Sequence, residues 1–275
     1  MPRAPLLLAA ALALGVAACD AVPRVAPPDP ATGSSPTTSA TRPFRVTDVA
    51  AYDEPWAMTF LPGTSRLLVT ERGGRMSVRD VESGALSGVD GLPAVVAEGQ
   101  GGLGDVIVAP DFAESRGIYL SWAEAGEGGV GAAVGRARLV LDGDRAHLDG
   151  LTVIWRQTPK VEGAGHFGHR LAIGPDGRHL FVTSGERQKF DPAQDLGTTL
   201  GKTLRLTLDG RPAPGNPFAD KGFPADEIWS YAHRNPLGIA FDAAGTLWES
   251  EMGPKGGDEI NLILPGANYG WPKAS

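Results

Sequence analysis

The chain has 275 residues, of which 38 are glycine, 23 are proline and 42% are hydrophobic. This length suits one large domain with a sizeable core, and the hydrophobic content excludes disorder along the whole chain. The net charge of −7 argues against nucleic acid as a partner. A turn-rich composition combined with a normal core favours many short strands.

The N-terminus has the features of an export signal. The chain begins with a short basic stretch, and residues 6–16 form an apolar run that is too short to span a bilayer. Small residues then precede Cys19, the single cysteine of the chain. This order is typical of bacterial lipoprotein processing sites. We therefore predict a lipoprotein-type signal over residues 1–19 that ends at Cys19, with an ordinary cleaved signal as the alternative.

Residues 20–43 are rich in proline, serine, threonine and alanine and show no hydrophobic period. Such a composition predicts a disordered, flexible tether. The folded domain is predicted to occupy residues 44–275. The protein is expected to be exported to the periplasm and anchored to a bacterial membrane only through a lipid on Cys19.

From residue 44 onward, a pair of apolar strands joined by a Pro, Asp or Gly turn recurs four times, which is a hairpin signal. The pairs are residues 57–63 with 66–72, 105–111 with 117–122, 170–177 with 179–184, and 238–245 with 246–250. The units are 48, 65 and 68 residues apart, and a propeller blade needs about 40–50. We predict an all-β chain with about four blades of a β-propeller, a β-sandwich being the alternative.

In a propeller, the loops between blades meet near the central channel, so the polar loops are candidate sites. The Gly-flanked loop 163–170 carries His166 and His169, which core packing explains poorly. A loop histidine can take a proton from an alcohol. A metal site and a plain surface histidine remain alternatives. The glycine-rich run 98–105 lets the backbone approach a ligand near Gln100, unless it is a simple turn.

Two further loops carry charge. The stretch 185–195 is interpreted either as a solvated loop or as a source of substrate contacts. The turn 233–236 combines an imidazole, a guanidinium and an amide. Arg234 in this turn can stabilise a developing oxyanion, and Pro236 stiffens the turn that presents it.

The run 248–261 gathers carboxylates around a Gly-Pro turn. Backbone carbonyls at Gly253 and Pro254, together with the carboxylates of Asp258 and Glu259, are the oxygen ligands that Ca²⁺ prefers. Because Asp258 and Glu259 are adjacent, they point in opposite directions in an extended segment and do not serve one ion in the same way. A plain acidic turn is the alternative.

Seven short motifs, taken in order, resemble the soluble aldose sugar dehydrogenases that depend on pyrroloquinoline quinone (PQQ), the glucose/sorbosone dehydrogenase family. The motifs lie at residues 99–104, 165–168, 201–210, 216–218, 233–236, 253–261 and 268–272. The resemblance implies a six-bladed propeller with PQQ on its axial face. It also implies that an aldose is oxidised at C1 to the lactone and that a quinone or another periplasmic acceptor takes the electrons.

The resemblance also implies roles for individual residues. His166 matches the general base that takes the proton of the C1 hydroxyl while hydride moves to PQQ. Gln100, Asn235 and Asp258 match positions near the cofactor. Arg234 matches the residue that stabilises the reduced quinone oxygen.

Two calcium sites follow from the same resemblance. Gly253 and Pro254 match the carbonyl ligands of the Ca²⁺ that polarises PQQ, and Glu259 and Tyr269 match ligands of a second, structural Ca²⁺. The strand units end at the fourth, so the propeller is expected to be incomplete at its C-terminus. Two other functions stay open: a metal-dependent lactonase-type propeller hydrolase, and a non-catalytic binding propeller.

Overall fold

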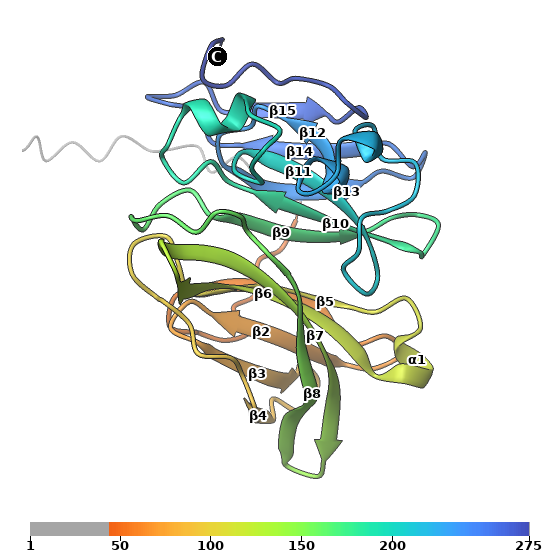
Figure 1. Cartoon of the computed structure of the whole chain (residues 1–275). Helices are drawn as coiled ribbons and strands as arrows, with labels where there is room; N and C mark the ends of the chain where they lie inside the picture. Colours follow the sequence, from red (N-terminus) through yellow and green to blue (C-terminus); the bar gives the residue numbers. More distant parts are fainter. Residues whose placement is uncertain (1–43, 275) are drawn as a thin grey trace, which may run out of the picture. The chain divides into compact units, whose positions relative to one another are not determined.

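The computed structural model describes residues 44–274, and the predictions for the signal and tether lie outside them. Residues from Asp48 onward form one compact unit, and residues 44–47 are exposed and form no strand. The unit is built almost entirely from strands, with one short α-helix and three short 3₁₀ helices among residues 44–274 (Figure 1). Within this part of the chain, no helix is long and apolar enough to cross a membrane.

The first two blades share one continuous sheet. Its strands are β1 (Pro55–Phe60), β2 (Arg66–Glu71), β3 (Arg75–Asp80), β4 (Leu86–Asp90), β5 (Leu103–Val108), β6 (Gly117–Gly126), β7 (Gly129–Asp142) and β8 (Arg145–Arg156). The order in the sheet is β1-β2-β3-β4-β8-β7-β6-β5. Each blade is an antiparallel meander of four strands, and parallel pairing of β4 with β8 joins the two blades.

The third and fourth blades are separate sheets in the orders β12-β11-β10-β9 and β13-β14-β15. Their strands are β9 (Gly168–Ile173), β10 (His179–Ser184), β11 (Lys202–Thr207), β12 (Ile228–Tyr231), β13 (Pro236–Phe241), β14 (Leu247–Glu251) and β15 (Glu259–Leu262). The helices are α1 (Phe112–Ser115), η1 (Asp191–Gln194), η2 (Ala219–Lys221) and η3 (Ala225–Glu227). All four predicted hairpins are present, as β1–β2, β5–β6, β9–β10 and β13–β14. The predicted all-β propeller with about four blades is therefore confirmed.

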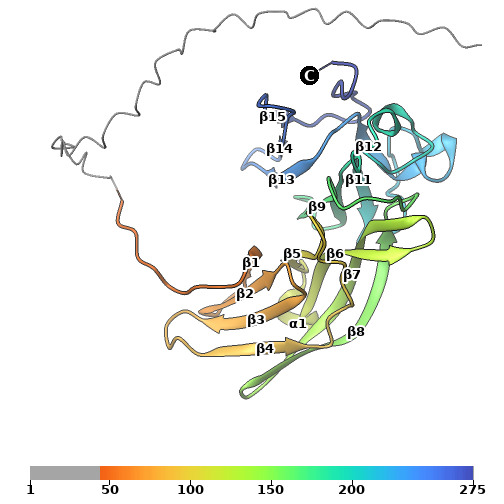
Figure 2. The ribbon, with the colours of Figure 1, turned by 90° about the vertical axis from the view of Figure 1, so that its left-hand side faces the viewer.

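The first strand of every blade lies on the inside of an arc. Figure 2 shows β1, β5, β9 and β13 near the centre of this arc, with β4, β8 and β12 at its outside, and consecutive inner strands contact each other. The hairpin turns follow the inner strands, whereas the loops between blades precede them. These two sets of loops therefore lie at opposite ends of the blades, and the inter-blade loops converge at one end.

Strand β10 shows how the blades are held together. Leu180 and Val182 belong to a core cluster shared with Tyr119 of the second blade, and Phe181 packs edge-to-face on Phe241 of the fourth blade at 5.2 Å between ring centroids. Alternate side chains point to opposite faces of a strand. Because both faces are covered, the sequence of this strand is a continuous apolar run and does not alternate.

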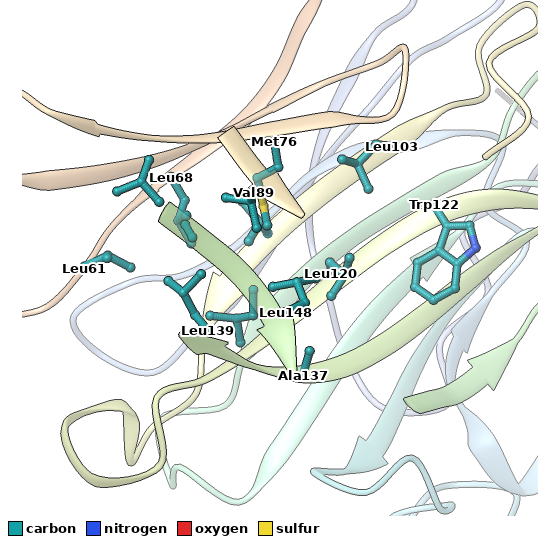
Figure 3. Packing of buried hydrophobic residues seen from close by; sticks show 14 of the residues in the cluster. Leu61, Leu68, Met76, Val89, Leu103, Leu120, Trp122, Ala137, Leu139 and Leu148 are labelled. Carbon is teal, nitrogen blue, oxygen red and sulfur yellow. The ribbon is translucent and has the colours of Figure 1, made fainter. Parts of the chain in front are cut away.

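The first and second blades pack through a cluster of their own. Leu68 and Val89 of the first blade belong to one buried cluster with Leu139 and Leu148 of the second, and Figure 3 shows these side chains close together. Burying an aliphatic side chain of this size stabilises a fold by about 1.5–3 kcal/mol. This contact and the β4–β8 pairing fix the first two blades relative to each other.

A buried carboxyl group links the second blade to the third. Glu227 is buried, and its Oε2 accepts a hydrogen bond from Trp155 Nε1 at 2.9 Å. Burial raises the pKa of Glu227 to about 7, although the bond from Trp155 acts in the opposite direction. Between the ordinary value of 4.5 and about 7, the folded state binds more protons than the unfolded state, so stability falls as pH rises through this window.

The substitution Glu227→Gln keeps an acceptor for Trp155 but cannot ionise. We expect the free energy of unfolding of the variant minus that of the wild type to be about 1–3 kcal/mol larger at pH 8 than at pH 5. Urea denaturation at both pH values measures this difference. Asp242→Asn is a matched control, because Asp242 also accepts from a tryptophan, Trp248, but its pKa is lowered and it stays ionised over this range. A pH-independent difference for Glu227→Gln would contradict the argument.

Candidate functional site

The inter-blade loops bring several predicted site residues together. The N–H of His166, in the β8–β9 loop, donates to Oε1 of Gln100, in the β4–β5 loop, at 2.7 Å. Oδ1 of Asn235, in the β12–β13 loop, accepts from the N–H of Gly168 at 3.2 Å. Residues that lie more than a hundred positions apart in the sequence therefore meet at one end of the blades.

His166 is fixed through its main chain and through one nitrogen of its ring. Its side chain is buried, and its Nδ1 lies 2.5 Å from Oε1 of Glu186, which is fully buried. In the neutral ring, a proton on Nδ1 would satisfy this contact, because a carboxylate oxygen accepts hydrogen bonds. Nε2 makes no hydrogen bond within residues 44–274 and keeps a lone pair that can accept a proton.

Glu186 is the functional residue that the sequence did not single out. The solvated-loop interpretation of the stretch 185–195 is wrong for Glu186 and Arg187, which are buried. It is correct for residues 188–191, which are exposed. In the sequence, the feature that could have pointed to Glu186 was the preceding glycine, Gly185. A Cβ at this position would lie 2.1 Å from the carbonyl oxygen of His166, so the glycine marks a close approach of two loops.

Arg234 lies with its guanidinium against the Gly-Pro turn. Nη1 donates to the carbonyl oxygens of Met252 at 2.8 Å and Gly253 at 3.2 Å, and Cζ lies 5.2 Å from the ring centroid of Trp271. Nε is buried and has no hydrogen-bond partner in the part of the chain that the structure describes. A buried donor without a partner costs free energy unless a ligand supplies an acceptor, and an anionic oxygen fits this position.

The main chain of Arg234 is anchored by a buried network. Its N–H donates to one carboxylate oxygen of Glu251, and the other oxygen accepts from Nδ1 of His233 at 3.0 Å. His233 is fully buried and stacks on Tyr269 at 4.6 Å between centroids. Burial lowers the pKa of His233, but the hydrogen bond with Glu251 and the charges of Glu249 and Glu251 outweigh it, and the net shift is upward.

The four predicted metal ligands line one small cavity of about 10 Å³. These residues are Gly253, Pro254, Glu259 and Tyr269. Carbonyl, carboxylate and phenol oxygens are ligand types that a hard cation such as Ca²⁺ accepts, but here the carbonyl of Gly253 accepts from Arg234 and the hydroxyl of Tyr269 donates to Leu262. Among residues 44–274, no three His, Asp or Glu side chains are grouped as a metal site. Most of the four predicted ligands would therefore contribute a carbonyl or phenol oxygen and not a carboxylate.

The other predicted residues of this run are engaged locally. Asp258 Oδ1 accepts from the N–H of Gly253 at 2.9 Å, which braces the turn. Glu259 Oε2 accepts from Asn261 at 3.0 Å. The hydroxyl of Tyr269 donates to the carbonyl of Leu262 at 2.6 Å. Asp258 is exposed and does not line the small cavity.

A second cavity, of about 290 Å³, adjoins the first, since Met252 lines both. Its walls include Gln100, His169 and Asn235. This volume is near the lower end of the range for small-molecule sites. A larger, mainly apolar cavity of about 640 Å³ lies against β1 and β2 and contains none of the predicted site residues. His166 and Arg234 do not line the 290 Å³ cavity, but their neighbours Phe167 and Asn235 do.

His169 is part of the wall of the 290 Å³ cavity. Its ring is buried and stacks on Trp56 at 4.9 Å, and its Nδ1 lies 2.8 Å from Oγ of Ser121. Burial lowers the pKa of His169 to about 3, with a further contribution from Arg170 and Arg187. His169 is therefore neutral at neutral pH and, unlike His166, pairs with no carboxylate in the part of the chain that the structure describes.

The comparisons with known proteins identify the family. The family described as Glucose / Sorbosone dehydrogenase matches residues 52–275, and the chain belongs to this family. It is 44% identical over 225 residues to the aldose sugar dehydrogenase YliI of Escherichia coli and 32% identical over 260 residues to the quinoprotein glucose dehydrogenase B of Acinetobacter calcoaceticus. These alignments cover 81% of this chain but only 60% and 51% of the two relatives.

Solved structures give the same result. The apo form of the soluble aldose sugar dehydrogenase of Escherichia coli superposes with a TM-score of 0.75 at 45% identity, over 80% of this chain and 63% of that one. The PQQ-bound aldose sugar dehydrogenase of Streptomyces coelicolor superposes with a TM-score of 0.74 at 34% identity, over 84% and 66%. The resemblance identified from the seven motifs is therefore confirmed.

The close approach at Gly185 generates a test. In Gly185→Ala, the added methyl group would collide with the carbonyl of His166, and we expect a loss of about 1–3 kcal/mol in the free energy of unfolding, measured by urea denaturation. Gly73→Ala is the control, because a Cβ there meets nothing within 4 Å. Equal stability of the two variants would show that the loop yields to the methyl group without cost.

Proposed function

We propose that this chain takes part in the PQQ- and Ca²⁺-dependent oxidation of aldose sugars at C1 to the lactone. The observation that carries the proposal is the pair formed by His166 and buried Glu186 next to a cavity lined by Gln100 and Asn235. The family and the named activities of the relatives support the same reaction class. The chain spans about half to three fifths of the length of these curated relatives.

His166 is proposed as the general base. Nε2 accepts the proton of the C1 hydroxyl, and the resulting imidazolium keeps its Nδ1–H on the carboxylate of Glu186, 2.5 Å away. The negative charge of Glu186 stabilises the imidazolium in a site from which water is largely excluded. A positioned base of this kind contributes about 10²–10⁴-fold to the rate.

Arg234 is proposed to meet the negative charge that develops on the acceptor. Its unpartnered Nε–H is a donor fixed in advance, because Nη1 is held by the carbonyls of Met252 and Gly253. A donor that does not need to reorganise stabilises a developing oxyanion more than a mobile one does. The contact with Trp271 restricts the guanidinium further.

The donor set fits both cofactors. Gln100, Arg234, Asn235 and Asp258 would hold PQQ, which when bound supplies the hydride acceptor. Gly253 and Pro254 would hold the Ca²⁺ that polarises it, and Glu259 and Tyr269 a second, structural Ca²⁺. The unpartnered donor of Arg234 and the presence of Gly253, Pro254, Glu259 and Tyr269 around one small cavity support this assignment.

Reconstitution tests the function. The purified chain is incubated with PQQ and Ca²⁺, PQQ binding is measured by equilibrium dialysis, and dye reduction is followed with a panel of aldoses; YliI serves as the positive control. We expect His166→Asn to lower kcat by about 10²-fold or more, and Glu186→Gln to lower it by about 10- to 100-fold, because glutamine accepts the hydrogen bond without balancing the charge. PQQ affinity should remain within about threefold.

Other outcomes would contradict the proposal. Sugar oxidation unaffected by His166→Asn would remove the base. PQQ or sugar binding without turnover would favour a binding propeller, and lactone hydrolysis without PQQ would favour a hydrolase. The physiological acceptor is proposed to be a quinone or another periplasmic carrier.

The location of the protein is a separate proposal from the sequence. Export and a lipid anchor at Cys19 would place the propeller in the periplasm, on a bacterial membrane. In cells fed radiolabelled palmitate, we expect the wild-type protein to be labelled and to sediment with membranes, and Cys19→Ser to be unlabelled. Labelling of both proteins, or of neither, would contradict the anchor.

A further inference from the structure

We propose that Arg187 is a positioning residue that holds the loop 163–167, and with it His166, in the orientation needed for proton transfer. The inference deepens the proposed function and rests on it, since it concerns the same base. No motif or resemblance pointed to Arg187; the structure alone assigns the role, through the contacts of one buried guanidinium.

The guanidinium of Arg187 contacts the loop on both sides of His166. Nε donates to the carbonyl of Gly165 at 2.8 Å, and Nη2 donates to the carbonyl of Gly163. Cζ lies 3.7 Å from the ring centroid of Phe167. The main-chain N–H of Arg187 donates to the carbonyl of His166 at 3.1 Å. Arg187 therefore contacts each residue from Gly165 to Phe167.

The loop needs such a restraint. His166 has a φ of +50°, in the left-handed region that a non-glycine residue adopts only at a cost. The neighbouring glycines, Gly163, Gly165 and Gly168, give the free loop many other conformations. A strained conformation persists only when surrounding contacts over-determine it. Gln100 fixes the N–H of His166, and Arg187 fixes its carbonyl and the residues on either side.

Packing alone does not explain an arginine here. Arg187 is 1% exposed, and in the described part of the chain it makes no salt bridge with a carboxylate. Burial lowers the pKa of Arg187 to about 10, so the group is still charged at neutral pH. Burying a charge is costly, and an apolar side chain would fill the space more cheaply. The guanidinium provides several hydrogen-bond donors fixed in one plane, which neither an apolar side chain nor a lysine can provide.

The chain contains a matched control. Lys202 is also buried, and its Nζ also donates to three carbonyls, those of Pro192, Ala193 and Leu200. These carbonyls lie in the second half of the β10–β11 connection, at residues 192–200, whereas Glu186 and Arg187 lie at its start and contact the loop of His166. Removing either cation therefore deletes a comparable set of buried hydrogen bonds, but only Arg187 acts on the base.

The experiment compares Arg187→Met, Arg187→Lys and Lys202→Met without cofactor or sugar. Amide hydrogen exchange is measured along the chain, and the ¹⁵N signals of the His166 ring report which nitrogen carries the proton. We expect Arg187→Met to speed exchange in residues 163–168 by about tenfold or more, and to replace the single Nδ1–H form by a mixture. Arg187→Lys should show a smaller change at the same residues. Lys202→Met should speed exchange only in residues 190–201.

These readouts are independent of turnover, so a failure of the proposed reaction would not be mistaken for a failure of the restraint. In the reconstituted enzyme, Arg187→Met should lower kcat by about 10- to 100-fold with KM nearly unchanged, because the base is displaced while the cavity remains. Uniform acceleration of exchange along the chain, or an unchanged His166 ring signal, would show a merely structural role and overturn the inference. If Arg187→Met does not fold, the same outcomes are decided with Arg187→Lys.

Discussion

Every blade that lies between two other blades must have both faces of its sheet covered, and the rest of the structure depends on that constraint. In β10, Leu180 and Val182 pack toward the second blade while Phe181 packs toward the fourth. A sheet buried on both faces can be satisfied only between two neighbours. This requirement arranges the blades around the inner strands and brings the loops that precede those strands to one place.

The site combines rigid and strained elements. Two buried carboxylates each fix one residue of the proposed site. Glu186 fixes the ring of His166, and Glu251 fixes the main chain of Arg234. Left-handed backbone occurs at His166, His169 and Arg187, on both loops around the base. Such conformations concentrate where surrounding contacts hold a side chain in a functional orientation. The cost of the strain is offset by the packed blades below the loops.

The sequence predicted whatever depends on local chemistry. The Pro/Asp/Gly turns indicated the four hairpins, and the order of seven motifs indicated the family. His166, Arg234 and the Gly253–Pro254 turn were selected because an imidazole, a guanidinium and carbonyls next to carboxylates suit a base, an oxyanion and a cation respectively. Glu186 and Arg187 were missed because charged residues after a strand ordinarily face water. Their burial depends on contacts with a loop twenty positions earlier in the chain, and no local pattern encodes those contacts.

The pairing of β4 with β8 makes the first two blades different from the others. They share a backbone hydrogen-bond ladder as well as a side-chain core. Opening either blade must break both kinds of contact, so the two form a single cooperative unit within the propeller. The third and fourth blades form separate sheets, which a parallel backbone bridge between Tyr231 and Asn268 connects. The extended ladder between the first two blades therefore couples their opening more tightly than the single bridge couples the third blade to the fourth.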